Sequence, residues 1–168
     1  VNLASGNYAE LTLSGSYTGS GTNFLQLRTA LDGTGSPTDG LVFDGNNPTG
    51  ATLISIVNDG GLGGTTTGDG IRIVRAINGA TIADDVFALE NGHADAGLYR
   101  YNLFQGGSNV GEEDDLYLRT VGLSSNVSLY AAAPSVALGY GLHMIGTLHD
   151  RMDLGEILRV DDPITMSF

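Results

Sequence analysis

Three histidines are the side chains of this sequence best suited to act as acid–base groups or metal ligands near neutral pH. They are His93, His143 and His149. His143 and His149 are six residues apart in a segment with helical spacing, so they fall on different faces of a helix and form a poor metal pair. His93 lies in NGHADAG, a turn-like sequence that predicts a surface position. Because no GxSxG or HExxH motif occurs either, we expect no catalytic, cofactor-binding or metal-binding residues.

Carboxylates form three clusters, at Asp84–Asp85, Glu112–Asp115 and Asp161–Asp162. Parallel β-helix enzymes that cleave polysaccharides also use carboxylates, in some cases with Ca²⁺, but they place them along one wall of strands. Here each cluster falls in a segment predicted to turn, so we expect the acids to be solvated. A polysaccharide lyase or glycosidase is the alternative to a non-enzymatic role. Weak Ca²⁺ binding, at Glu112–Asp115 or in TTTGDGIRIV (Thr65–Val74), is a further alternative.

The composition excludes several classes of function. The 168 residues carry a formal net charge of −12, and all seven basic residues are arginine. Without clustered cations the chain lacks the surface that binds nucleic acid or anionic lipid. The absence of lysine also excludes a Walker A loop and Schiff-base chemistry. The chain has no cysteine, which fits either a core that needs no disulfide or a chain that crosses an oxidising compartment unfolded.

Most of the chain consists of short strand-like segments separated by polar turns. Apolar and polar residues alternate in several of these segments, as in half-buried strands. The 26 glycines suit turns that need positive φ angles. Strand–turn units that recur without helices favour a β-solenoid over a barrel. The predicted strands are Ala9–Ser14, Asn23–Thr29, Gly40–Asp44, Ala51–Asn58, Gly70–Ile77, Asp85–Glu90, Gly97–Phe104 and Asp115–Thr120.

One stacking register follows if each coil of the solenoid contains three strands. Apolar pairs from every third strand would then lie on one wall and stack between coils. The predicted stacks are Leu11–Leu13 with Ile54–Ile56 and Tyr101–Leu103, Leu25–Leu27 with Ile71–Ile73 and Leu116–Leu118, and Leu41–Phe43 with Phe87–Leu89.

The composition changes after Asn126. From Leu129 to Met152 apolar residues recur at helical spacing. Three glycines in this segment each cost a helix about 1 kcal/mol relative to alanine, so the helix needs a partner surface. Leu129 to Leu148 contains no formally charged residue, and a membrane-spanning helix is therefore an alternative, but Pro134, the glycines and His143 argue against it.

Several motifs together resemble the C-terminal passenger region of bacterial autotransporters, the pertactin-like family. They cover most of the chain from Ala9 to Arg151 and occur in the family's order. The tail motif MIGTLHDR resembles the segment that precedes the family's outer-membrane β-barrel. The other motifs are LTLSGSYTGSGTNFLQLRTALDGTGSPTDGLVFDG, GGLGGTTTGDGIRIV, AGLYRYNLFQGG and DLYLRT.

The resemblance implies an all-β fold, a right-handed, single-stranded parallel β-helix whose last coils and cap occupy residues 1–126. Residues 127–168 would be a short helical or irregular connector toward an outer-membrane β-barrel that is absent from this sequence. In the family the capped end, called the autochaperone or junction region, folds first and templates the upstream coils. The implied role is non-enzymatic, in export and surface display within an adhesin or virulence factor. The implied partners are the protein's own barrel, its upstream coils and a host surface ligand, at the bacterial surface or in secreted form after cleavage.

A physical reason exists for a cap to fold first. Each inward aliphatic side chain stabilises the stack by about 1.5–3 kcal/mol when it is fully buried, but the first coil has no neighbour on which to stack. Aromatic residues close together in sequence bury large areas and suit such a nucleus. We predict that the folding core and cap are formed by Leu25, Leu27, Ile71, Ile73, Tyr99, Tyr101, Phe104, Leu116, Tyr117 and Leu118.

Overall fold

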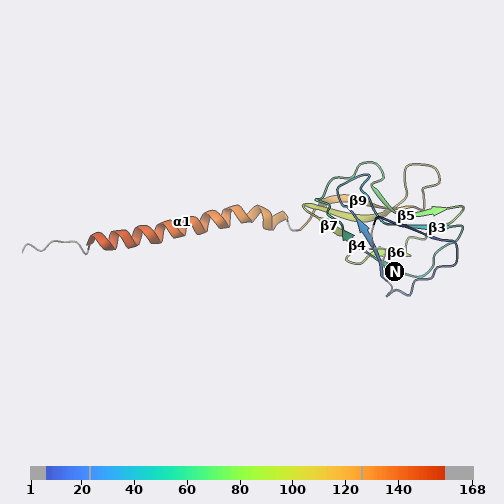
Figure 1. The fold of residues 1–168 in the computed structure, drawn as a ribbon, viewed down its shortest axis with the longest axis horizontal. Helices are drawn as coiled ribbons and strands as arrows, with labels where there is room; N and C mark the ends of the chain where they lie inside the picture. Colours follow the sequence, from blue (N-terminus) through green and yellow to red (C-terminus); the bar gives the residue numbers. More distant parts are fainter. Residues whose placement is uncertain (1–6, 23, 126, 158–168) are drawn as a thin grey trace, which may run out of the picture. The chain divides into compact units, whose positions relative to one another are not determined.

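The computed structural model describes residues 7–22, 24–125 and 127–157 (Figure 1). It divides into two compact units, 1–124 and 125–168, which are considered separately. The first unit holds all the described strands and the second holds one helix. The strands are β1 Glu10–Leu13, β2 Phe24–Thr29, β3 Gly40–Asp44, β4 Thr52–Asn58, β5 Ile71–Ile77, β6 Phe87–Leu89, β7 Ala94–Ala96, β8 Tyr99–Gln105 and β9 Leu116–Leu123.

All eight predicted strands are confirmed, with ends that differ from the prediction by three residues or fewer. Strand β7 was not predicted. Its sequence, Ala-Asp-Ala, has no large apolar or β-branched side chain, so it carries no strand signal of its own. Pairing with β8 alone makes it a strand.

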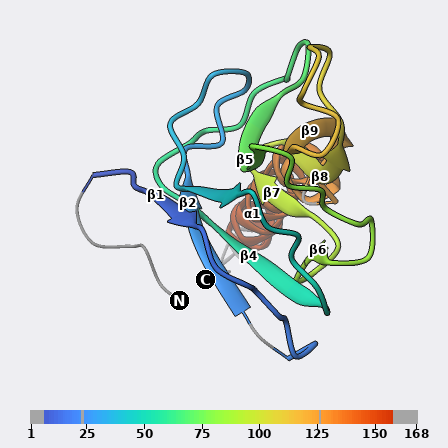
Figure 2. The same cartoon turned by 90° about the vertical axis from the view of Figure 1, so that its right-hand side faces the viewer.

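The strands form two sheets, and the chain visits them in turn. One sheet has the order β1-β3-β5-β9-β8-β7 and the other the order β2-β4-β6. Pairing is parallel from β1 through β3 to β5 and from β2 through β4 to β6. Figure 2 shows β2 and β4 side by side although the whole of β3 lies between them in sequence. The unit is therefore mostly β structure built on parallel sheets.

The predicted three-strand register is wrong. Leu11 pairs with Leu41, not with Ile54, and Leu25 pairs with Ile54 in the other sheet. Segments that the register placed on one wall lie in different sheets, because each pass contributes two long strands instead of three. An isolated bridge also joins Thr18 and Thr49, in segments where no strand was predicted. Of the predicted stacks, only Ile71–Ile73 and Leu116–Leu118 are neighbours, and their pairing is antiparallel.

The parallel order ends at β5. Strand β9 pairs antiparallel with β5, β8 pairs antiparallel with β9, and β7 pairs antiparallel with β8. Pairing between β5 and β9 shifts register between Arg72 and Val74. The last strands in the sequence therefore close one edge of the six-stranded sheet by turning back on themselves.

The core lies between the two sheets and is continuous through the unit. It contains both aliphatic and aromatic side chains, with Tyr17, Phe43 and Phe87 in mutual ring contact at centroid distances of 5.7, 6.2 and 5.8 Å. These rings come from three successive passes of the chain and join them. The largest fully buried apolar side chains are Tyr101, Phe43, Leu27, Leu31, Leu41, Ile54, Ile71, Ile73, Leu118 and Val74.

The second unit is the helix α1, Val127–Ile157. It contains the predicted helical stretch and extends beyond it at both ends. Pro134 lies inside it. Its large apolar side chains between Val136 and Ile145 are exposed, with Val136 at 69% and Met144 at 54%. Within the described part of the chain, no helix is both long enough and apolar enough to cross a membrane.

Candidate functional site

The candidate site for pairing with a further coil consists of β1 and β2, the strands at the N-terminal edge of each sheet. Strands β1 and β2 are the outermost strands on that side, and each pairs in parallel with the next strand inward. Among the described residues, no strand covers their outer edges. An uncovered strand edge presents a row of backbone N–H and C=O groups that template another strand.

Hydrogen-bond directions identify which groups of β1 face outward. The Gly40 N–H donates to Ala9 O at 2.9 Å, and the Asn46 amide donates to Leu13 O at 2.6 Å. In a parallel pair the N–H and C=O of one residue point to the same side, and the side alternates along the strand. The backbone of Thr12 therefore faces the outer edge.

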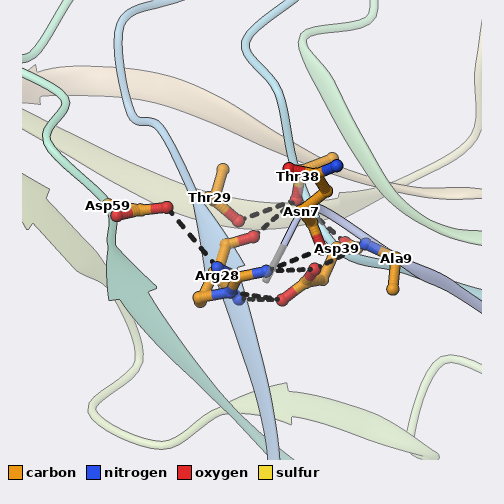
Figure 3. A network of polar contacts seen from close by, with 7 residues as sticks. All are labelled: Asn7, Ala9, Arg28, Thr29, Thr38, Asp39 and Asp59. Carbon is orange, nitrogen blue, oxygen red and sulfur yellow. Dashed lines mark hydrogen bonds and ion pairs between the residues drawn. The ribbon is translucent and has the colours of Figure 1, made fainter. Parts of the chain in front are cut away.

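A buried aspartate fastens the start of β1 to the next pass (Figure 3). Asp39 is fully buried and precedes β3. Its Oδ1 accepts from the Ala9 N–H at 2.8 Å, and its Oδ2 accepts from the Arg28 N–H at 2.9 Å and from Arg28 Nε at 3.3 Å. Because β1, β2 and β3 each contribute to or adjoin these bonds, one carboxylate sets their relative positions.

Arg28 extends this network in two directions. One guanidinium nitrogen, Nη2, donates to Asn7 O at 3.0 Å, and Nη1 lies 3.8 Å from Asp59 Oδ2. Its guanidinium also lies 5.3 Å from the ring centroid of Tyr8. Burial by itself raises the pKa of Asp39, but the hydrogen bonds from Ala9 and Arg28 and the Arg28 charge outweigh it and hold that pKa below its ordinary value. The carboxylate is thus kept ionised in a buried position.

At the opposite end, Tyr101 ties the closing strands to two earlier passes. The side chain is fully buried. Its hydroxyl accepts from the Gly64 N–H at 2.8 Å and lies 2.6 Å from Gly64 O and 3.2 Å from Leu31 O, the carbonyls to which it can donate. Thr120 on β9 donates to the same Gly64 carbonyl at 3.0 Å. One phenol therefore holds loops that are distant from it in sequence.

Asp115 is a second buried carboxylate, at the start of β9. It accepts from the Ala76 N–H at 2.7 Å and from Arg72 Nη1 at 3.3 Å. Burial raises its pKa above the ordinary value, although Ala76 and Arg72 oppose the shift. The expectation that the whole Glu112–Asp115 cluster is solvated was therefore wrong for Asp115, because docking of β9 on β5 carries it into the interior.

The last turn of the unit is held by Asp95. Arg100 donates to it through Nε at 2.9 Å and through Nη2 at 3.0 Å, and Ser124 Oγ donates at 2.8 Å. The Arg100 hydrogen bonds lower the pKa of Asp95. His93 Nε2 lies 3.7 Å from the same carboxylate, with its side chain 34% exposed. The imidazole is thus a neighbour of the Arg100–Asp95 ion pair.

The structure buries most of the predicted folding residues. Tyr99 is partly buried against the core. Phe104 is 38% exposed, so its expected burial was wrong: strand alternation that points Tyr101 and Leu103 inward turns Phe104 outward, where Arg119 lies 5.5 Å from its ring. The buried members are Leu25, Leu27, Ile71, Ile73, Tyr101, Leu116, Tyr117 and Leu118. Their role in folding stays a prediction.

Sequence reasoning missed the importance of Asp39 and Asp115. Both immediately precede a strand, and both accept a backbone N–H from another pass. Four arginines on strands pair with aspartates: Arg28, Arg72, Arg100 and Arg119. The available signal was an aspartate directly before a predominantly apolar strand, in a chain whose cations are all arginine.

The remaining acidic clusters show no catalytic arrangement. Asp84 and Asp85 are exposed in a turn, as expected. Asp161–Asp162 lie outside the described residues. In the part of the chain that the structure describes, no three His, Cys, Asp or Glu side chains converge as a potential metal site.

Carboxylates do line one groove, on the outer face of the six-stranded sheet, at Glu10, Asp69 and Glu112. Ser108 Oγ donates to Asp69 at 2.6 Å, and Arg72 Nη1 lies 3.1 Å from Glu112. The Ser108 hydrogen bond lowers the pKa of Asp69, whereas the acid of a glycosidase needs a raised pKa. This arrangement does not favour the polysaccharide-cleaving alternative.

Comparisons with known proteins agree with the geometry. Residues 2–103 match the family described as Autochaperone Domain Type 1. The chain is 32% identical over 143 residues to the adhesin BmaC autotransporter of Brucella suis biovar 1 (strain 1330), a match that covers 82% of this chain and 4% of that protein. It is 38% identical over 108 residues to the autotransporter adhesin AIDA-I of Escherichia coli, covering 64% of this chain and 8% of that protein.

The chain thus corresponds to a small part of each of these relatives. The family match spans β1 to β6 and continues into β8, so it includes both the open edge and the start of the antiparallel end. The predicted relationship to the autotransporter passenger region is confirmed, and the chain belongs to the type 1 autochaperone domain family of autotransporter adhesins.

Proposed function

We propose that the β unit is the C-terminal end of a right-handed parallel β-helix and acts as the template on which upstream coils fold. One observation carries the proposal: no described strand covers the parallel edges at β1 and β2, whereas beyond β5 the six-stranded sheet continues with antiparallel strands and the three-stranded sheet ends at β6, a strand of three residues. Growth by strand addition is therefore favoured on the N-terminal side, since short edge strands resist further pairing. A stack with one open end has a defined direction of folding.

The closed end supplies the stability that nucleation requires. Tyr101 is fully buried and bonds to two earlier passes, so the strands that close the sheet are joined to the coils they close. A new coil added at β1 and β2 then finds prepared backbone partners and an apolar surface. Burial of each further inward aliphatic side chain contributes about 1.5–3 kcal/mol, which makes sliding of a partly exported chain back through a pore unfavourable.

The wider role follows from the relatives. BmaC and AIDA-I are named as autotransporter adhesins, and we propose that this domain supports export and display of such a passenger at the bacterial surface. Its immediate partners would be the upstream coils and its own outer-membrane barrel, with α1 as the connector. The domain itself would be non-enzymatic, and contact with a host ligand would belong to the whole adhesin.

The test blocks the open edge without disturbing the rest of the domain. Thr12→Pro removes an N–H that faces outward, while the bonds from β3 to Ala9 and from Asn46 to Leu13 remain. Proline is tolerated at the free edge of a sheet for this reason. In the full-length passenger we expect Thr12→Pro to reduce the protease-resistant upstream coils at the cell surface severalfold.

Thr12→Val is the matched control, because it keeps the N–H and a β-branched side chain. The isolated chain with Thr12→Pro should retain its urea midpoint, which separates loss of templating from loss of folding. Normal display of folded upstream coils by the Thr12→Pro passenger would contradict the proposal.

A further inference from the structure

A groove crosses the outer face of the six-stranded sheet and begins beside Glu10 on β1. Its volume is about 550 Å³, within the range typical of small-molecule sites. Glu10 on β1 stands beside Gly40 on β3 in the pairing register, and Arg72 on β5 stands beside Tyr117 on β9. Four strands thus contribute to one surface, which we call the outer groove.

A glycine forms part of the floor of the outer groove. Gly40 lies within β3 and has no positive φ angle, so its backbone conformation does not require glycine. A Cβ atom placed there would meet only the Glu10 side chain, at 3.5 Å from Cγ and 3.8 Å from Oε2. The absent side chain therefore leaves a hollow that strand geometry alone does not explain.

The walls carry planar polar side chains that are already held in place. Arg72 lies between Glu112 at 3.1 Å and Asp115 at 3.3 Å. Asn109 Nδ2 donates to Glu112 Oε2 at 2.9 Å. Side chains fixed before binding lose less conformational entropy when a ligand arrives.

The chemistry of these walls selects the class of ligand. Carboxylates accept hydrogen bonds, a guanidinium donates them and an amide does both, and together these planar groups suit the adjacent hydroxyl groups of a sugar. Tyr8 adds an aromatic ring to the lining, against which the C–H face of a sugar can pack. The acids Glu10, Asp69 and Glu112 outnumber Arg72, and Arg72 is already paired, so an anionic glycan is disfavoured.

We propose that the outer groove binds a neutral oligosaccharide of hexose or N-acetylhexosamine units. The sugar would lie across Gly40 between Glu10 and Arg72, with its hydroxyl groups on Asn109 and the carboxylates. This binding site is separate from the templating edge, since the groove residues act through side chains on the sheet face and the edge acts through backbone groups.

The experiment follows backbone amide shifts of the isotope-labelled chain during titration with three neutral trisaccharides. They are cellotriose, triacetylchitotriose and 3′-galactosyllactose. We expect saturable shifts at Glu10, Arg72 and Asn109 with at least one of them. A heparin disaccharide and a tetra-arginine peptide, tested in parallel, should cause none at these residues.

Gly40→Val is the decisive variant, because valine suits a strand and its side chain fills the floor. We expect it to weaken sugar binding about tenfold or more, as when an added group occupies a fitted pocket, with an unchanged thermal midpoint. Thr12 lies on β1, as Glu10 does, but does not line the groove. The Thr12→Val variant should therefore bind sugar as the unmodified chain does.

Three outcomes would overturn the proposal. The first is the absence of saturable shifts with all three trisaccharides at concentrations up to about 10 mM, because a dissociation constant above that value means very weak binding. The second is equal binding by the Gly40→Val variant. The third is saturable binding of the arginine peptide in the groove in place of sugar, which would make this a docking site for a cationic segment.

Discussion

The two ends of the β unit differ in how their outermost strands are paired. At the N-terminal end β1 and β2 keep parallel edges that another coil could extend. At the C-terminal end β9, β8 and β7 fold back antiparallel, and the outermost strand, β7, has only three residues. Short edge strands resist further pairing. The two ends of the six-stranded sheet therefore differ in strand direction, with parallel pairing at β1 and antiparallel pairing at the short β7.

The two ends also differ in what holds them. The open end depends on a charged network centred on Asp39, in which backbone N–H groups and Arg28 share one carboxylate. The closed end depends on a buried aromatic side chain, Tyr101, with a hydroxyl that reaches two earlier passes. Electrostatic fastening depends on pH, whereas burial of an aromatic ring hardly does.

The largest expected effect is at the closed end. Tyr101→Ala should lower the free energy of unfolding by about 3–5 kcal/mol, because it leaves a cavity in the core, and Tyr101→Phe by about 1–3 kcal/mol through the unpartnered groups at Gly64 and Leu31. Urea unfolding measures both. Phe104→Ala on the same strand is the control, and a loss as large as that of Tyr101→Ala would contradict the different roles of the two rings.

A somewhat smaller loss is expected at the open end. Asp39→Ala removes the acceptor of the part-buried hydrogen bonds from the Ala9 and Arg28 N–H groups, which costs about 1–3 kcal/mol. Hydrogen exchange should accelerate in β1 before it does in β8. The exposed Asp84→Ala variant should leave exchange unchanged, and uniform acceleration in the Asp39→Ala variant would show that the two ends are not fastened separately.

The pH dependence should be smaller and should act on the open end. The pKa of Asp39 is lower in the folded state than its ordinary value of 3.8. Its contribution to stability is therefore fully present above that ordinary value and is lost as pH falls toward the lower folded-state pKa. Urea midpoints measured from neutral pH down into this range should fall less steeply for Asp39→Asn than for the unmodified chain.

Asp115 predicts the opposite sign for the closed end. Burial raises its folded-state pKa, so protonation stabilises the folded form relative to the unfolded one as pH falls through that pKa. Asp115→Asn should therefore remove a contribution that stabilises the folded form at low pH. If Asp39→Asn and Asp115→Asn changed the urea midpoint at acidic pH in the same direction, the electrostatic difference assigned to the two ends would be wrong.

The smallest effect is expected at the last turn. Arg100→Gln removes the paired hydrogen bonds to Asp95 but leaves the donor Ser124 in place. The change should speed hydrogen exchange in β7 and β8 with little effect on the urea midpoint, because the pair is partly exposed and screened by solvent. Arg75→Gln, at an exposed position on β5, is the matched control.

Local patterns determined much of this protein before any coordinates. Alternating apolar residues and glycine-rich turns located eight strands, and the absence of lysine and cysteine excluded whole classes of chemistry. These features depend on neighbouring residues, whose geometry the strand period determines. The motifs shared with autotransporters identified the family as well.

Only the tertiary structure decided which strands meet. Leu11 pairs with Leu41 and not with Ile54, because each pass of the chain contributes two long strands and not three. It also decided that Asp115 is buried, that Phe104 faces outward and that β7 exists. Strand pairing and burial depend on the path of the chain between distant segments, and the alternation within one strand carries no information about that path.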